Sequence, residues 1–467
     1  MSQDAVEAAE RVVEERVKRR GDLLFSAAGR LSKSWVIDTR PLRVPAYRRM
    51  WVGNGVSFFG FQFTSVAVPV EMFQITHSSN WVGLLGLAGL VPLLIFGLWG
   101  GAAADVIDRR KLLLASSILA WLSTVGLLAQ ALIGVGSGWL LLALTAMQSA
   151  GFAVSSPTRQ AIVPRIVPSR LVPAANTLTY TTTTAGGVLG PLAAGLIFGV
   201  ATTSTGVTVA YLVDAALFTV SFWATWKLPP IPPIVHPEDE ERPSAGLRGI
   251  VDGLRFLVTQ PVLLLSFAVD IIAMVFAMPR ALFPEVATDR FGGGAAIGWL
   301  YAAIAIGSVV AGLASGWIGR VKRQGVALVV AVVGWGVAIG FSGLAHSLWL
   351  MVLLLALGGA ADLVSAVYRQ SMLQTFAPDR LRGRLQGVFI VVVAGGPRLG
   401  DLRAGATADL TSTTFSWAGG GFLAAGLALG LAAAFPALIR YRPPAAPAAE
   451  TTHHPTAPPA TQKRSDD

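Results

Sequence analysis

Apolar stretches of about 20 residues recur along the chain, and no other feature of the sequence constrains the fold as strongly. A helix of that length crosses the roughly 30 Å of hydrocarbon in a bilayer and satisfies its own backbone hydrogen bonds. Hydrophobic residues make up 53% of the sequence and charged residues 13%, which excludes an ordinary soluble domain. The alternating strands of an outer-membrane barrel are absent. The sequence therefore predicts an all-α polytopic membrane protein.

Twelve membrane spans fit these stretches. We expect them at residues 50–74, 79–104, 112–134, 138–160, 172–199, 206–227, 261–284, 294–318, 325–345, 347–375, 383–409 and 414–440. Nearly all Lys and Arg residues lie before the first span, in alternate connections or after the last span; the exceptions are Arg280, Arg290, Arg398 and Arg403. The positive-inside rule then places both termini in the cytoplasm. We expect a multi-pass protein of the inner (plasma) membrane.

An internal repeat divides the spans into two pseudo-symmetric halves of six helices. Arg159 and Gln160 recur 210 residues later as Arg369 and Gln370, and the glycines of the fifth span recur with the same offset in the eleventh. Duplicated six-helix units are typical of transporters whose halves rock around a midplane site. We expect a cytoplasmic N-terminal segment with an amphipathic helix (1–48), an N-terminal six-helix half (49–227), a cytoplasmic linker (228–260), a C-terminal six-helix half (261–442) and a disordered cytoplasmic tail (443–467).

The connection between the second and third spans carries a motif of one glycine, two acids and three bases. Its members are Gly101, Asp105, Asp108, Arg109, Arg110 and Lys111. The bases can make charge-assisted contacts to the end of a neighbouring helix, so the loop can act as a gating latch. It resembles the loop motif of the major facilitator superfamily, with Val106 and Asp108 in place of the usual arginine and glycine. The alternative is a loop that only follows the positive-inside rule.

The expected fifth span carries a second motif of small residues around a proline. Its members are Gly186, Gly190, Pro191 and Gly195. Glycines at this spacing allow close helix packing, and a proline removes a backbone donor and bends the helix. The motif resembles the Gly-Pro motif of the antiporter branch of the superfamily. A role in packing alone would require the same residues.

Charged residues inside the spans are the candidates for proton coupling or substrate binding, because ionisable groups at bilayer depth are costly. They are Glu71, Asp214, Asp270, Arg280, Asp362, Arg369, Arg398, Asp401 and Arg403. Asp401 is the first choice, since it can pair with Arg398 at i,i+3 and has no charged counterpart in the other half. For Glu71, Arg280 and Arg369, anchoring at a membrane edge is an equal alternative. Asp214 is expected to support contacts between helices.

Several functions are excluded or disfavoured by what the sequence lacks. The chain has no cysteine, which excludes disulfides, thiolate metal sites and cysteine nucleophiles. No phosphate-binding loop of ATP-driven pumps is present, and the net charge of +10 follows the membrane connections, not one nucleic-acid-binding face. We therefore expect a secondary transporter, not an enzyme, without cofactor or metal. Its expected partners are a small-molecule substrate, protons and the lipid bilayer; a monomer is favoured, with the oligomeric state left open.

Finer resemblances narrow the family. Residues 66–70, 76–78, 82–84, 298–303 and 371–375 are similar to segments of the bacterial enterobactin exporters. The resemblance covers roughly residues 40–440 and implies the major facilitator fold and proton-driven export of a siderophore or similar hydrophobic compound. The chain differs from that family in carrying charge at Glu71, Asp362, Arg369, Arg398 and Arg403. Multidrug or macrolide-type efflux is the alternative, and a non-transporting membrane scaffold is a distant third.

Overall fold

The computed structural model describes residues 38–232, 254–377 and 382–442, with only the backbone described for several residues near one end of α3 and of α14. The predicted amphipathic helix, most of the predicted linker and the C-terminal tail lie outside the described residues. Within them, long helices account for nearly all of the chain and no strand occurs, which confirms the predicted fold class.

The first half consists of six long helices, which are α2 (Pro45–Thr76), α3 (Ser79–Val106), α4 (Arg109–Ile133), α5 (Gly138–Ile166), α6 (Val172–Val200) and α7 (Thr203–Trp226), with short 3₁₀ turns η1 (Arg40–Arg43) and η2 (Ser169–Leu171). Side-chain oxygens of Ser78, Ser137 and Thr202 accept backbone hydrogen bonds at the starts of α3, α5 and α7. These caps satisfy amides that a helix start leaves free, so each short connection ends sharply.

The second half repeats the pattern with interruptions. Its elements are α9 (Pro261–Phe276), η4 (Arg280–Leu282), α10 (Phe283–Phe291), α11 (Ala295–Leu313), η5 (Ser315–Arg320), α12 (Gln324–Leu344), α13 (Leu348–Phe376), α14 (Arg382–Leu410), the π-helical η7 (Phe415–Gly419), α15 (Gly420–Ala434) and α16 (Pro436–Arg440). The span predicted at 261–284 is therefore not one helix. It breaks before Pro279, because a proline ring disfavours helical backbone in the residue that precedes it.

Eleven segments of the described chain are long and apolar enough to cross a membrane. The helix α14 is not among them, although it has the length of a span and packs between them. It carries Arg398, Asp401 and Arg403 within two turns. Together with α14 these segments give the twelve spans expected from the sequence.

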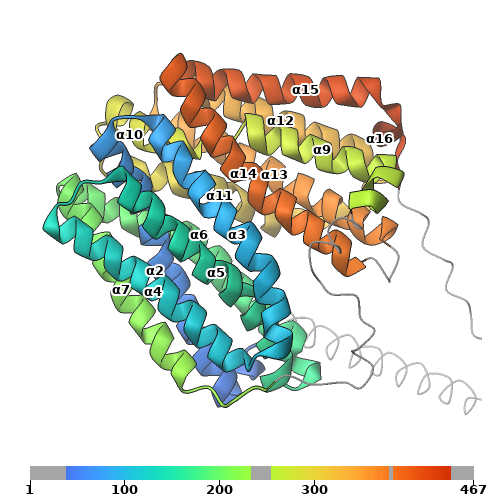
Figure 1. Cartoon of the computed structure of the whole chain (residues 1–467). Helices are drawn as coiled ribbons and strands as arrows, with labels where there is room; N and C mark the ends of the chain where they lie inside the picture. Colours follow the sequence, from blue (N-terminus) through green and yellow to red (C-terminus); the bar gives the residue numbers. More distant parts are fainter. Residues whose placement is uncertain (1–37, 233–253, 378–381, 443–467) are drawn as a thin grey trace, which may run out of the picture.

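The helices form two bundles that meet along two helix pairs, α3 with α14 and α6 with α11 (Figure 1). We call the side where residues 38 and 442 lie the terminal face, and the side with connections 77–78, 134–137 and 201–202 the far face. The bundles are joined near the far face, where a Cβ on Gly195 would lie 2.6 Å from the Cα of Gly298. There Ser78 donates a 2.5 Å hydrogen bond to Asp409, and Ser79 donates one to Glu285.

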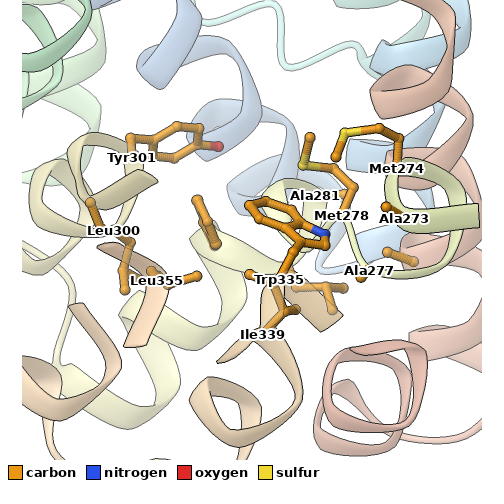
Figure 2. Packing of buried hydrophobic residues seen from close by; sticks show 14 of the residues in the cluster. Ala273, Met274, Ala277, Met278, Ala281, Leu300, Tyr301, Trp335, Ile339 and Leu355 are labelled. Carbon is orange, nitrogen blue, oxygen red and sulfur yellow. The ribbon is translucent and has the colours of Figure 1, made fainter. Parts of the chain in front are cut away.

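A core of apolar side chains fixes the second half around α9. Figure 2 shows Trp335 of α12 between Leu355 of α13 and Ala277, the residue that follows α9. The Trp335 side chain is 1% exposed. Gly358 of α13 lies next to this ring, since a Cβ there would be in van der Waals contact with it at 3.4 Å. This packing holds the broken end of α9 in place beside the central cavity.

The first residues of the predicted linker differ from expectation. Leu228 and Ile231 are 3% and 4% exposed and pack in a cluster with Tyr47 and Leu113 of the first half. The amide of Ile231 also donates to Asp108 at 3.1 Å. Burial of these two apolar side chains outweighs solvation, so this part of the linker belongs to the first bundle.

Candidate functional site

A central cavity of about 440 Å³ lies between the two halves, a volume suited to a drug-sized ligand. Both bundles contribute polar side chains to its wall, including Gln62, Ser65, Gln148, Arg280, Arg398 and Asp401. Close approach of α3 and α14 closes it on one side, since a Cβ on Gly86 would lie 2.7 Å from the carbonyl oxygen of Arg398. The glycines of α3 thus determine how near the charged helix can come.

A second cavity of about 620 Å³ continues from the first toward the terminal face. The two share Phe61 and Gln148, and the second extends to Pro164 and Val172 at the terminal ends of α5 and α6. Its wall is aromatic where the rings of Phe61 and Phe152 stack, with centroids 6.2 Å apart. The shared residues make the two cavities one path from the terminal face to the centre.

Asp401 lies in the wall of the central cavity, as expected for a site residue. Its Oδ1 accepts a 3.1 Å hydrogen bond from the amide of Ala281, which is available because the chain breaks before η4. Arg280 lies beside it, with its guanidinium carbon 5.7 Å from the centroid of the Tyr301 ring. The break after α9 therefore brings an amide and a cation to Asp401, which the sequence did not reveal.

The predicted pairing of Arg398 with Asp401 is wrong for this conformation. Arg398 donates a 2.8 Å hydrogen bond to the carbonyl of Ala394, and no ion pair with Asp401 forms within 4.0 Å among the described residues. Its Nε lies 3.3 Å from the place of a Cβ on Gly89, so the side chain extends toward α3. Arg398 consequently faces the cavity with capacity to donate to a ligand.

Arg403 has a different environment from its two neighbours. Its guanidinium donates to the carbonyl oxygens of Val275, Phe276 and Ser416 at 3.2, 2.6 and 3.1 Å. The carbonyls of Val275 and Phe276 lie at the C-terminal end of α9, where they lack intrahelical partners and a cation stabilises them. Arg403 therefore holds the end of α9 and the start of η7 together and does not line the central cavity.

A separate charged cluster lies inside the second half. Arg369 of α13 forms an ion pair with Asp270 of α9, and its other terminal nitrogen lies 3.8 Å from Asp362. Arg369 is 4% exposed, so the anchoring role at a membrane edge is wrong for this residue. Because a buried charge is costly without a partner, this pair ties α9 to α13.

Two further predicted carboxylates, Glu71 and Asp214, lie inside the first half. Glu71 is 8% exposed and accepts hydrogen bonds of 2.6 Å from both Gln130 and Tyr211, so it is not a membrane-edge anchor. Asp214 is fully buried and accepts from Thr64 at 2.6 Å and Thr124 at 3.4 Å. The expected contact between helices at Asp214 thus takes the form of hydroxyl donors from α2 and α4.

The predicted gating loop contacts neighbouring elements of its own half. Asp108 caps α4 by accepting from the amides of Arg110 and Lys111 at 2.8 and 3.2 Å. Arg109 donates to the carbonyl of Ala161 at 3.1 Å, and Arg110 to that of Trp226 at 2.7 Å. Lys111 is exposed, and the surroundings of Gly101 and the side chain of Asp105 are outside the described part. Two of the three bases therefore bind backbone carbonyls of α5 and α7 within one bundle, and the latch role stays a prediction.

The predicted antiporter-like motif forms two helix contacts. Added Cβ atoms on Gly186 and Gly190 would lie 2.9 Å from Phe58 and 2.4 Å from Gln62 of α2. Farther along α6, the Pro191 carbonyl and Gly195 meet Gly298 of α11 across the two halves. The motif is thus a packing seam whose second part joins the bundles, and one of its contacts, Gln62, lines the central cavity.

Several cavity residues escaped prediction from the sequence. Thr64, Gln148 and Tyr301 line the central cavity, but their uncharged side chains are common in membrane helices. For Gln148, the only signal in the sequence was its position within a span, because a side-chain amide at bilayer depth needs a hydrogen-bond partner. In the structure, the Gln148 side chain donates to Thr124 at 3.1 Å. For Tyr301, the contact with Arg280 depends on the break after α9, which sets its position.

Comparison with known proteins places the chain in a family. The profile of the transmembrane secretion effector family of the major facilitator superfamily matches residues 37–463. The enterobactin exporter EntS of Shigella boydii serotype 18 (strain CDC 3083-94 / BS512) is 30% identical over 397 residues, covering 84% of this chain and 92% of that protein. EntS of Escherichia coli O81 (strain ED1a) matches with the same identity and coverage.

Solved structures share the fold at lower identity. The nucleoside transporter NupG gives a TM-score of 0.66 at 14% identity, covering 85% of this chain and all (100%) of that one. A bacterial homologue of the iron transporter ferroportin gives 0.62 at 13% identity, covering 85% and 99%. The chain therefore belongs to the transmembrane secretion effector family of the major facilitator superfamily, and it is a multi-pass efflux transporter of small molecules, not an enzyme.

Proposed function

We propose that this protein exports an anionic, partly aromatic small molecule of the siderophore kind from the cytoplasm in exchange for protons. The observation that carries the proposal is the gathering of Arg280, Arg398 and Asp401 at one wall of the central cavity. Guanidinium groups bind carboxylate and catecholate oxygens by charge-assisted hydrogen bonds. The similarity to enterobactin exporters supports the same substrate class.

Asp401 connects substrate binding to proton binding in this proposal. The substrate would bind between the two arginines, Arg280 and Arg398, and the ionised Asp401, with its anionic oxygens accepting from the arginines and a hydroxyl group donating to the carboxylate. Protonation of Asp401 removes that acceptor and weakens substrate binding, so proton and substrate exclude one another, as exchange in opposite directions requires. The glycine seam of α6 and the gating loop, chiefly Asp105 with its neighbouring bases, would control the change of access.

The orientation in the proposal follows from charge. The terminal face carries the basic connections, and the positive-inside rule makes it cytoplasmic, with both chain ends on that side of the inner membrane. The path from the terminal face to the central cavity is then the entry for a cytoplasmic substrate. A monomer is sufficient, because both cavities lie within one chain.

The test is transport of enterobactin into everted membrane vesicles containing the full-length protein, with and without an imposed proton gradient. We expect accumulation that requires the gradient and is lost in Arg280→Gln, while Arg440→Gln, a change at an exposed arginine outside the cavity, behaves as the parent. Equal accumulation with and without the gradient would contradict proton coupling. No accumulation at all would contradict the substrate class.

Multidrug efflux is the second candidate, favoured by the aromatic wall of the second cavity, which extends toward the terminal face. Phe58, Phe61, Phe152 and Tyr180 offer apolar contact there without a fixed charge requirement. Gradient-driven uptake of ethidium, a hydrophobic cation, by the same vesicles in the absence of enterobactin transport would favour this candidate. The cavity reaches the terminal face, so nothing in the structure favours a sealed, non-transporting scaffold.

A further inference from the structure

The two buried carboxylates of the first half differ from those of the second half in having no cation. In the second half, Arg369 accompanies both Asp270 and Asp362. Among the described residues no ion pair involves Glu71 or Asp214, and all their hydrogen bonds come from uncharged donors. A carboxyl group buried without a cation is most stable in its neutral form, which carries a proton.

The charged and titratable groups of the surrounding helices lie toward the two faces. On the terminal side they are Tyr47, Arg48 and Arg49 of α2, Arg109, Arg110 and Lys111 of α4, Arg159 and Arg165 of α5, and Tyr180 of α6, with Asp105 at the terminal end of α3. On the far side they are His77, which follows α2, and Glu285, Asp289 and Arg290 of α10. Arg159, the deepest of these cations, donates to Asn54.

Each carboxylate is connected to a different compartment. Glu71 lines a small cavity of about 140 Å³ at the far face, formed with Gln130, Gly134 and Ser204. Asp214 is linked to the central cavity by hydroxyl groups, since Thr64 lines that cavity and Gln148 donates to Thr124. The first half therefore holds one proton-binding group near outside water and one near the substrate.

Tyr211 lies between the two carboxylates. Its hydroxyl donates to Glu71 at 2.6 Å, and it precedes Asp214 by three residues on the same face of α7. The Oδ1 of Asp214 has no hydrogen-bond partner in the described structure. It faces Gly60, where a Cβ would lie 2.8 Å away. Hydrogen bonds thus join Tyr211 to Glu71 and Asp214 to Thr64 beside the central cavity, and none joins Tyr211 to Asp214 in the described structure.

We propose that Glu71, Tyr211 and Asp214 form a proton relay through the first half, which carries protons from the far face to the central cavity separately from the substrate path. This inference rests on the proposed proton coupling. The missing hydrogen bond between Tyr211 and Asp214 interrupts the relay in this conformation, so protons do not leak when the cavity faces the terminal side. Rotation of the Asp214 side chain away from Gly60 and toward Tyr211 completes it.

The first experiment needs no substrate. The infrared spectrum of the purified full-length protein in lipid contains the carbonyl stretch of protonated carboxyl groups, and subtracting the spectrum of a variant from that of the parent shows which bands the variant has lost. We expect Asp214→Asn and Glu71→Gln each to remove one band at neutral pH. The control is Asp38→Asn, because hydrogen bonds from Arg40 lower the pKa of Asp38 and keep it ionised. Retention of the parent's bands in both test variants would overturn the proposal.

The second experiment separates the relay from the proposed function. In proteoliposomes, we expect Asp214→Asn and Glu71→Gln to lose gradient-driven accumulation of enterobactin but to keep its exchange at equal concentrations. Tyr211→Phe, which removes only the hydroxyl group, should slow accumulation and preserve exchange. Parent-like accumulation in Asp214→Asn would overturn the relay alone. A parent protein that fails to accumulate enterobactin contradicts the proposed function, and the infrared bands then still decide whether these groups hold protons.

Discussion

Individual arginines of α14 have different roles although they lie within six residues of one another. Arg398 extends toward the central cavity, whereas Arg403 binds three backbone carbonyls at the junction of α9 and η7. Both satisfy the rule that an intramembrane charge needs partners, but only the first lines the central cavity, where its remaining N–H donors can reach a ligand. Charge at bilayer depth therefore identifies candidates without distinguishing binding from structural roles.

Asp401→Asn tests the coupling role of the cavity carboxylate. The amide keeps the shape and can still accept from the Ala281 amide, but it cannot bind and release a proton. We expect gradient-driven export to fall to the level of vesicles without the protein, while binding of enterobactin persists. Equilibrium binding and uptake by everted vesicles measure the two effects. Parent-like accumulation would make Asp401 structural.

Arg403→Gln tests the structural role of the other arginine. Loss of the cation leaves carbonyls at the end of α9 without their charged donor, and we expect a destabilisation of about 3 kcal/mol. A lower midpoint of thermal unfolding in detergent would show it. Arg440→Gln is the control, since Arg440 is exposed on α16. An unchanged midpoint in Arg403→Gln would mean that water or other donors satisfy these carbonyls.

At the level of helices, glycine determines which pairs can approach. The seam of α6 lies against α2 at Gly190 and against α11 at Gly195. The glycines of α3 likewise pack closely against α14; at Gly83, a Cβ would lie 2.6 Å from the Asp401 carbonyl oxygen. Helices in lipid associate through such close packing, because no hydrophobic effect drives them together there.

Gly190→Leu tests the seam with a control from the same helix. A leucine at 190 would displace Gln62 and push α6 from α2, so we expect transport to be lost while the protein still reaches the membrane. A leucine at Gly187 meets open space, with no atom within 4 Å of its Cβ, and should leave transport unchanged. Uptake per amount of protein in everted vesicles measures both. Equal activity of the two variants would mean that the seam tolerates separation.

At the level of the whole molecule, the two bundles are joined near the far face, with the cavity path reaching the terminal face. Ser78 and Asp409 form one of the hydrogen bonds that join the bundles at the far face. Alternating access requires these bonds to break when the central cavity opens to the other side. The contacts between the bundles near the far face and the path to the terminal face therefore belong to one state of a cycle.

A cross-link at the far face tests this cycle, and the natural absence of cysteine makes the parent chain a clean background. We expect the Ser78→Cys, Asp409→Cys double variant to stop exporting after treatment with a short bifunctional thiol reagent. Each single variant serves as a control and should keep the activity that it has before treatment. Continued export by the fully cross-linked protein would show that the far face need not open between these residues.

The sequence by itself determined the helical fold, the duplicated halves and the charged residues of interest. Membrane length, the positive-inside rule and the cost of buried charge are properties of the chain in lipid and require no knowledge of which helices touch. Asp401 and Asp214 could be named for this reason.

Only the tertiary structure decided which of these charges share an environment. Arg369 was a possible membrane-edge anchor until α9 brought Asp270 to it, and Arg398 was expected to pair with Asp401 rather than face the cavity. The break of α9 before Pro279 directs the Ala281 amide to Asp401, and Tyr211 reaches Glu71 across 140 residues of sequence. Such contacts depend on how helices far apart in the chain pack together, because a side chain's charge state and role follow from the partners around it, and those partners are not its neighbours in sequence.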